Sequence, residues 1–202
     1  MYGYVNVSTR DVKAESFWLM PATPDYQKEG VPYITSKNVK DGKIDFSEVK
    51  YITDEDYEAI SANRSIMKDD LLITMIGTIG EAAFVGDETR FYGQNIYLVR
   101  LNNEMVNRKY YYYFLTSPSV REKLISKKNA SSQGYIKAGS IEDLRFPLPS
   151  LKEQDDIVNK LERFDKLTGD ISEGLPAEIE ARQKQYEYYR DKLLSFKEKK
   201  CV

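Results

Sequence analysis

The sequence predicts a mixed α/β protein of the α+β kind, with one domain of short strands and helices followed by a long helical arm. Up to about Pro149, short apolar runs alternate with Gly, Pro and Asn, a pattern typical of strands and tight turns. After the segment PLPSLKEQ, apolar residues recur every three or four positions, which is the spacing of a helix with one buried face. We therefore expect a domain over residues 1–149 and a coiled-coil-forming arm over residues 150–202.

The first half of the chain supplies most of the predicted strands. Residues 31–39 (VPYITSKNV) are predicted to form a strand that enters a loop. Asp41-Gly42 is predicted to form the tight turn of a hairpin, since both residues tolerate the positive φ angles that such a turn requires. The other strand candidates lie on either side of the tetrapeptide GTIG and shortly after it, at residues 70–75, 81–85 and 95–101.

Signals for helix starts follow these strands. Asn107 can cap one helix by accepting backbone N–H groups of its first turn. Pro118 can occupy the first position of a second helix, where its missing N–H has no cost. Ser140 and Asp143 form a weak capping box, and residues 145–148 are predicted to form a last strand bounded by prolines.

The arm is predicted to contain two helices, the second opened by Pro176 after a Gly-Leu-Pro break. The second helix carries an a/d heptad seam, which we expect to face another helix. The alternative is that this helix folds back on its own domain. The apolar face of the first helix consists of Ile157, Leu161, Phe164, Leu167 and Ile171, and the seam of Ile179, Tyr186, Tyr189, Leu193 and Phe196.

Composition excludes several classes of function. None of the 202 residues is histidine, which excludes Ser-His-Asp and Cys-His nucleophilic schemes and histidine-ligated metals. The one cysteine, Cys201, cannot form a disulfide framework or a cysteine zinc site within the chain. No apolar run approaches the roughly 20 residues that cross a bilayer, and the start lacks signal-peptide features, so we expect a cytoplasmic protein.

The net charge of −2 hides a segregation of opposite charges along the chain. Acidic residues dominate residues 41–58, and basic residues dominate residues 105–137. The basic stretch ends in a polar segment, residues 127–137, where lysines suit phosphates and Asn, Gln and Ser can bond base edges. A second polar segment, residues 35–40, follows a predicted strand. The alternative is that both segments are solvated loops without a ligand.

Three further patterns have simpler explanations than the chemistry they imitate. The run Tyr110–Tyr113 could stack on bases, but four successive residues cover all sides of a helix, so packing is the favoured role. Asp45 with Glu48-Val49-Lys50 imitates a magnesium-dependent nuclease, although such spacing arises easily by chance when 31% of residues are charged. A methyltransferase would need a Gly-rich cofactor loop and a polar base-gripping motif, and only Asn95-Ile96-Tyr97 faintly resembles the latter.

Several motifs follow one another from Pro32 onward. Their combination, above all PLPSL followed by EQ and then by the GLPAEIEARQKQYEYYRDKLLSF helix, resembles the specificity subunits of type I restriction-modification systems. The resemblance is to a half-length form with one target-recognition domain. The motifs are PYI at 32–34, NV at 38–39, Gly42, DDLL at 69–72, GTIG at 77–80, YYYYFLTS at 110–117, PLPSL at 147–151, EQ at 153–154, Ile157, and the helix at 174–196.

The resemblance implies a non-catalytic protein that recognises DNA sequence and positions an adenine methyltransferase subunit and a motor endonuclease subunit. No cofactor or metal is then expected on this chain, whereas S-adenosylmethionine, ATP and Mg²⁺ are expected on those partners. Typical members hold two recognition domains and two long helices that pair antiparallel. With one of each, this chain is expected to form a homodimer through its arm and to recognise a split palindrome.

The competing hypothesis is an interaction protein or truncated decoy that binds the methyltransferase, or another specificity subunit, through the arm without reading DNA. Under the favoured hypothesis, the two polar segments and Thr78 contact double-stranded DNA. The candidate residues are Thr35, Lys37, Asn38, Lys40, Thr78, Lys127, Lys128, Asn129, Ser131, Ser132, Gln133, Tyr135 and Lys137.

Overall fold

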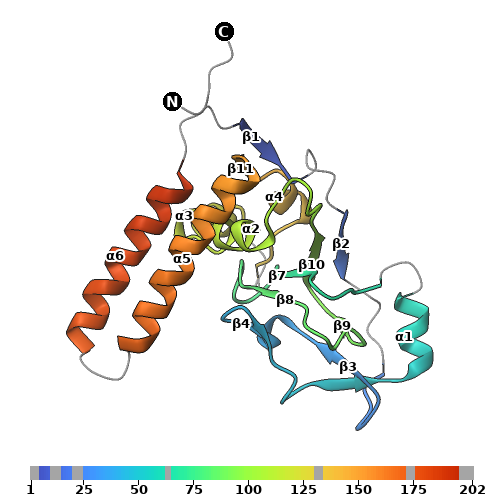
Figure 1. Ribbon diagram of the computed structural model, residues 1–202. Coiled ribbons are helices and arrows are strands. Elements are labelled where there is room, and N and C mark those ends of the chain that lie inside the picture. Colours follow the sequence, from blue (N-terminus) through green and yellow to red (C-terminus); the bar gives the residue numbers. More distant parts are fainter. Residues whose placement is uncertain are drawn as a thin grey trace. The chain divides into compact units, whose positions relative to one another are not determined.

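The chain forms two compact units, each assembled from separate stretches of the sequence (Figure 1). The computed structural model describes residues 5–9, 15–19, 25–61, 65–129, 134–171 and 176–195. What we call the sheet unit contains residues 14–101 and 123–142, and the helical unit contains residues 1–13, 102–122 and 143–202. The functional boundary expected between residues 149 and 150 stays a prediction.

The sheet unit is built on a four-stranded antiparallel sheet in the order β2-β10-β7-β8. A three-stranded sheet, β6-β3-β9, has β3 antiparallel to β6 and parallel to β9, and β4 and β5 form a hairpin. The elements are β2 Glu15–Leu19, β3 Val31–Ile34, β4 Val39–Lys40, β5 Lys43–Ile44, β6 Lys50–Ile52, α1 Asp54–Ser61, β7 Leu71–Thr74, β8 Ala82–Phe84, β9 Tyr92–Gly93, β10 Ile96–Arg100 and α4 Ala138–Glu142, with a 3₁₀ turn at Ser36–Asn38.

Apolar runs form the central strands because both of their faces are covered. All four residues of β7 are buried, as are four of the five residues of β10. The predicted hairpin is confirmed: Lys40 pairs with Lys43, and Asp41 and Gly42 have φ angles of 50° and 75°. The capping box predicted at Ser140 is wrong, because α4 already begins at Ala138 and places Ser140 inside the helix.

The helical unit contains the arm and the pieces that support it. Strand β1 (Val5–Ser8) pairs antiparallel with β11 (Arg145–Leu148). Helices α2 (Arg108–Leu115), α5 (Leu151–Ile171) and α6 (Pro176–Leu194) make up the rest, while α3 (Pro118–Ser126) begins in this unit and ends in the sheet unit. Asn107 caps α2 as predicted, since its side chain accepts from the backbone N–H groups of Lys109 and Tyr110. None of the helices in the described ranges combines the length and apolarity that a membrane span requires.

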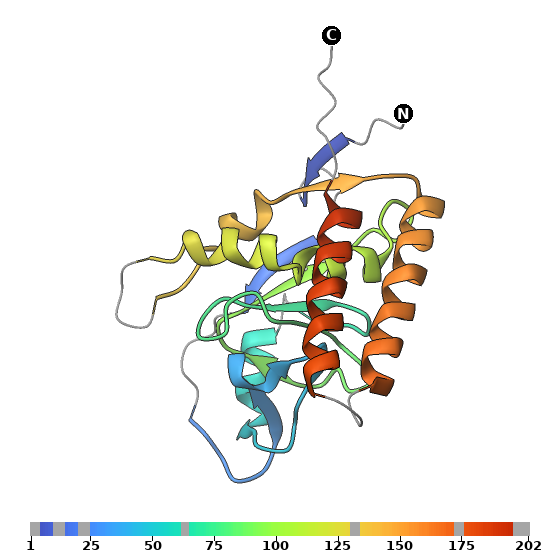
Figure 2. The same ribbon diagram turned by 90° about the vertical axis from the view of Figure 1, so that its left-hand side faces the viewer.

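The arm folds into a helical hairpin in which α6 runs antiparallel beside α5 (Figure 2). The ring of Tyr189 stacks on Phe164 of α5, with centroids 6.0 Å apart and an angle of 4° between the planes. Tyr186 forms a hydrogen bond with Asp165, and burial raises the pKa of its phenol. Two seam residues therefore face a helix of the same chain, namely the first helix of the arm.

The remaining predicted arm residues are divided between buried and exposed positions. Ile157 and Leu161 are buried, whereas Leu167 is 56% exposed, so the apolar face of α5 is shorter than its spacing suggested. Leu193 is half-buried beside the buried Leu194. Phe196 and the side chains of Ile171 and Ile179 lie outside what the structure describes.

Candidate nucleic-acid interface

The turn between β7 and β8, which belongs to the sheet unit, is held in place by side-chain hydrogen bonds. The hydroxyl of Thr74 donates to the carbonyl of Thr78 and accepts from the backbone N–H of Glu81 at 3.0 Å. Gly77 and Gly80 have φ angles of 71° and 82°, in the left-handed region where a side chain is strained. The turn therefore holds Thr78 at an exposed tip.

One of the two predicted polar segments lies directly beside this turn. Tyr135 forms an antiparallel bridge with Ile76, and the N–H of Ile136 donates to the carbonyl of Met75 at 3.0 Å. Ile136 is fully buried, while the next residue, Lys137, is exposed. Residues 134–137 are thus anchored along the end of β7.

The other polar segment lies beside the first glycine of the turn. A Cβ added to Gly77 would lie 3.4 Å from the hydroxyl of Ser36, which places the 35–38 segment against the GTIG turn. Lys37 and Lys40 are exposed there. Segments from three distant parts of the sequence therefore meet at one place, which the sequence alone did not show.

The lysines at the end of α3 precede a loop that is closed by hydrogen bonds. The N–H of Asn129 donates to the carbonyl of Tyr135 at 3.1 Å, and the N–H of Tyr135 donates to the Asn129 side-chain oxygen at 2.8 Å. Lys127 and Lys128 are exposed immediately before this closure. Ser131, Ser132 and Gln133 lie outside the described residues, so their role stays a prediction.

Asn38 does not have the exposure that a base contact requires. It is 7% exposed, and its side-chain oxygen accepts from both the backbone N–H and the hydroxyl of Thr35. Its amide nitrogen donates to the carbonyls of Asp45 and Glu48. Asn38 therefore fixes the loop from inside and is not expected to contact bases directly, whereas the contact expected at the half-buried Thr35 stays a prediction.

The enzyme-like patterns are occupied by structural contacts. Asp45 accepts from the backbone N–H of Ser47, and hydrogen bonds from this serine lower the pKa of the Asp45 carboxyl. The ammonium of Lys50 lies 3.8 Å from the ring centroid of Tyr26. Tyr97 is buried and donates to Glu142 at 2.8 Å, so it does not present a base-gripping surface.

The tyrosine run of α2 is a packing element, as favoured from the sequence. Tyr110 donates to the carbonyl of Pro147 at 2.9 Å, and the Tyr111 and Thr9 hydroxyls lie 2.9 Å apart. Tyr113 donates to Asp165 of α5 at 2.6 Å. All three rings are buried, and burial raises the pKa of Tyr111 to about 12. These rings therefore bind the helical unit together and are not available for stacking on bases.

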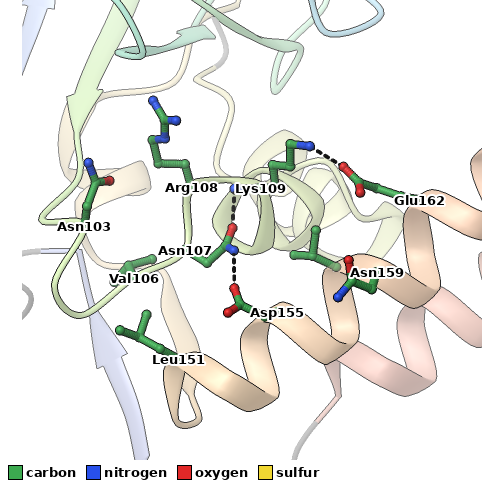
Figure 3. A pocket seen from close by; sticks show the side chains of 10 residues that line it. Asn103, Val106, Asn107, Arg108, Lys109, Leu151, Asp155, Asn159 and Glu162 are labelled. Atoms are coloured by element: carbon green, nitrogen blue, oxygen red, sulfur yellow. Dashed lines mark hydrogen bonds and ion pairs between the residues drawn. The ribbon is translucent and has the colours of Figure 1, made fainter.

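An open pocket of about 700 Å³ lies between the start of α2 and α5 in the helical unit (Figure 3). Its polar lining is engaged in contacts within the wall: Asn107 donates to Asp155 at 2.7 Å, and Lys109 pairs with Glu162. The pocket floor includes the buried Val106 and Val158. These contacts connect α2 to α5 and indicate no particular ligand.

Comparison with known proteins gives consistent matches. The family described as the type I restriction modification DNA specificity domain matches residues 19–181. A putative type I restriction enzyme specificity subunit of Haemophilus influenzae is 36% identical over 151 residues, which cover 72% of this chain and 37% of the relative. A type I restriction enzyme specificity subunit of Escherichia coli is 32% identical over 182 residues, covering 88% of this chain and 44% of the relative.

Solved structures of such subunits share the fold. The S subunit of a type I restriction-modification system from M. genitalium superposes with a TM-score of 0.57 at 18% identity, covering 84% of this chain and 41% of that one. The HsdS subunit of Thermoanaerobacter tengcongensis gives a TM-score of 0.62 at 14% identity, covering 95% and 45%. This chain thus spans less than half the length of the relatives it matches.

Proposed function

Because the chain belongs to the type I restriction modification DNA specificity family, we propose that it recognises DNA sequence for a type I restriction-modification complex. The main observation that supports the proposal is that three segments, residues 35–40, 77–80 and 134–137, lie together at the β7–β8 turn. Phosphate contacts supply affinity and base-edge contacts supply sequence preference, so a DNA-reading surface needs cations around a polar centre. The exposed side chains available there are Lys37, Lys40, Thr78, Lys127, Lys128 and Lys137, joined by the half-buried Tyr135.

The proposal gives the chain no catalytic step of its own. An adenine methyltransferase subunit would modify the recognised site and a motor endonuclease subunit would cleave unmodified DNA. S-adenosylmethionine, ATP and Mg²⁺ would then be bound by those partners. The sheet unit would recognise the DNA sequence, and the helical unit would provide the surface to which the partner subunits attach.

We further propose that two copies pair through α6, now through the surface that α5 does not cover. Tyr186 and Tyr189 contact α5, whereas Tyr188 is 60% exposed on the remaining surface. An antiparallel pair has a two-fold axis, so its two recognition surfaces would read inverted copies of one half-site. The target would be a split palindrome.

The experiment is to co-express the chain with its candidate methyltransferase subunit and to map methylated adenines across the host genome. A bipartite palindrome supports a dimer that reads DNA. An asymmetric motif would mean that a second recognition domain takes part, and an absence of motif-specific methylation would contradict DNA reading.

A matched pair of variants localises the surface. Replacing Lys127, Lys128 and Gln133 with alanine should abolish motif-specific methylation, because it removes two cations beside the turn. Replacing Lys28 and Lys68, two exposed lysines of the sheet unit that lie outside this surface, removes the same charge elsewhere and should leave methylation unchanged.

A further inference from the structure

The side chain of Lys128 occupies space that only a glycine leaves open. Gly134 is buried and has a φ angle of 48°. A Cβ at this position would lie 2.8 Å from Cδ and 2.9 Å from Cγ of Lys128, and closer still to Cε. Since carbon atoms attract optimally at roughly 3.5–4.0 Å, the lysine stem fills the volume that any side chain at residue 134 would need.

This contact is fixed to the frame of the proposed DNA surface. Asn129 and Tyr135, the residues that follow Lys128 and Gly134, are joined by two hydrogen bonds. Tyr135 is in turn bridged to Ile76 at the β7–β8 turn. The closure keeps Lys128 and Gly134 opposite each other, and Lys128 remains exposed beyond the contact.

We propose that Gly134 is a positioning residue that orders Lys128 as a phosphate-binding cation; this inference rests on the proposed function. Because Gly134 has no side chain, the aliphatic stem of Lys128 can pass over it, and Lys128 stays exposed to solvent. Because the stem is already ordered before DNA arrives, binding costs less side-chain entropy than at a lysine without such a contact. The three atoms nearest to a Cβ at Gly134 all belong to Lys128, and none belongs to Lys127.

A double-mutant cycle tests the inference on the full chain. The variants are Gly134→Ala, Lys128→Ala and the pair together, assayed by fluorescence anisotropy with a labelled duplex that carries the methylated motif, over a series of salt concentrations. Lys128→Ala should weaken binding about tenfold and reduce the log–log salt slope by about 0.9, the value for one phosphate contact. Gly134→Ala should act in the same direction, and should have no further effect in the Lys128→Ala background.

Two additional variants separate lysine positioning from backbone strain. Gly134→Asn fills the same space but tolerates a positive φ angle, so it should also weaken binding. In the Lys127→Ala background, Gly134→Ala should retain its full effect, because Lys127 does not cross the glycine.

The outcomes distinguish this inference from the function beneath it. If Gly134→Ala weakens binding equally with and without Lys128, the glycine acts through the backbone and the inference is wrong. Equal binding by Lys128→Ala and the unmodified chain would also overturn it, while leaving DNA reading intact. If the unmodified chain binds the motif no better than a scrambled duplex, the proposed function fails, and the inference fails with it.

Discussion

Gln154 is predicted to be the side chain on which attachment of α5 depends most. It is fully buried in the first turn of the helix. Its amide nitrogen donates to the carbonyls of Met105 at 3.0 Å and Pro149 at 2.9 Å, and its oxygen accepts from the N–H of Asn107 at 2.8 Å. One side chain thus joins the start of α5 to the loop that leads into α2. This explains why glutamine follows glutamate in the EQ motif.

The expected cost of Gln154→Leu follows from the three groups it would leave without partners. Leucine has a similar volume, so little of the loss comes from a cavity. The Pro149 carbonyl is bonded in a fully buried position and the other two groups are partly buried. An unsatisfied buried group costs about 1–3 kcal/mol, so we expect the free energy of unfolding to fall by roughly 3–5 kcal/mol. A chain of this size should lose on the order of 10 °C in Tm.

Urea unfolding followed by circular dichroism measures this change, and hydrogen exchange of residues 102–116 shows where it acts. The control is Glu153→Ala on the same helical turn. Glu153 accepts from the hydroxyl and N–H of Ser150 in an exposed capping box, so its loss should cost about 1 kcal/mol or less. The reasoning is refuted if Gln154→Leu is no more destabilising than Glu153→Ala.

Three other predictions follow from buried polar groups. Burial raises the pKa of Tyr111 from 10.0 to about 12, so the stability that the neutral phenol contributes is fully present below pH 10 and is lost as the pH rises toward 12. Urea unfolding at about pH 9 and about pH 11 should differ by about 1–1.5 kcal/mol from this group, and by less in Tyr111→Phe. Asn38→Ala removes four side-chain hydrogen bonds, so urea unfolding should show a loss of about 2–4 kcal/mol; because these bonds fix the loop that carries Lys37, the DNA affinity measured by anisotropy should fall as well. Asp70→Asn weakens the two hydrogen bonds that Asp70 accepts from the partly exposed Arg100, so the free energy of unfolding measured in urea should fall by about 2–3 kcal/mol. The control is Asp87→Asn, which alters an exposed pair with Lys68 and should cause no measurable change.

Local signals in the sequence were sufficient for most elements of the fold. The Asp41-Gly42 turn and the Asn107 cap each depend on contacts within a few residues, and both are confirmed; the strand at 145–148 is also confirmed, although its partner β1 lies at the other end of the chain. The capping box at Ser140 failed because a serine inside a short helix has the same local spacing as one at its start. Short-range patterns thus predict where elements lie more reliably than where they begin.

The candidate site was only partly predictable for a different reason. Sequence reasoning selected residues by type, and Asn38 has the right type for a base contact. Its amide instead satisfies backbone groups that a turn leaves unpaired, a demand that becomes visible only when Asp45 and Glu48 are brought beside it. Gly134 has no side chain that such a selection could choose. Its relation to Lys128 depends on the loop closure at Asn129, which no spacing rule reveals.

The arm shows that a heptad pattern does not identify its partner. Heptad spacing identifies the face of α6 that packs against a helix, but it does not state which helix. The deciding signal was the connection: only four residues separate Ile171 from Pro176, a length typical of an antiparallel helical hairpin. Because Tyr186 and Tyr189 contact α5, the described surface of α6 that stays open to a second copy is the more polar one around Tyr188. Pairing on such a surface would bury little apolar area, so its strength should depend on what the methyltransferase subunit adds.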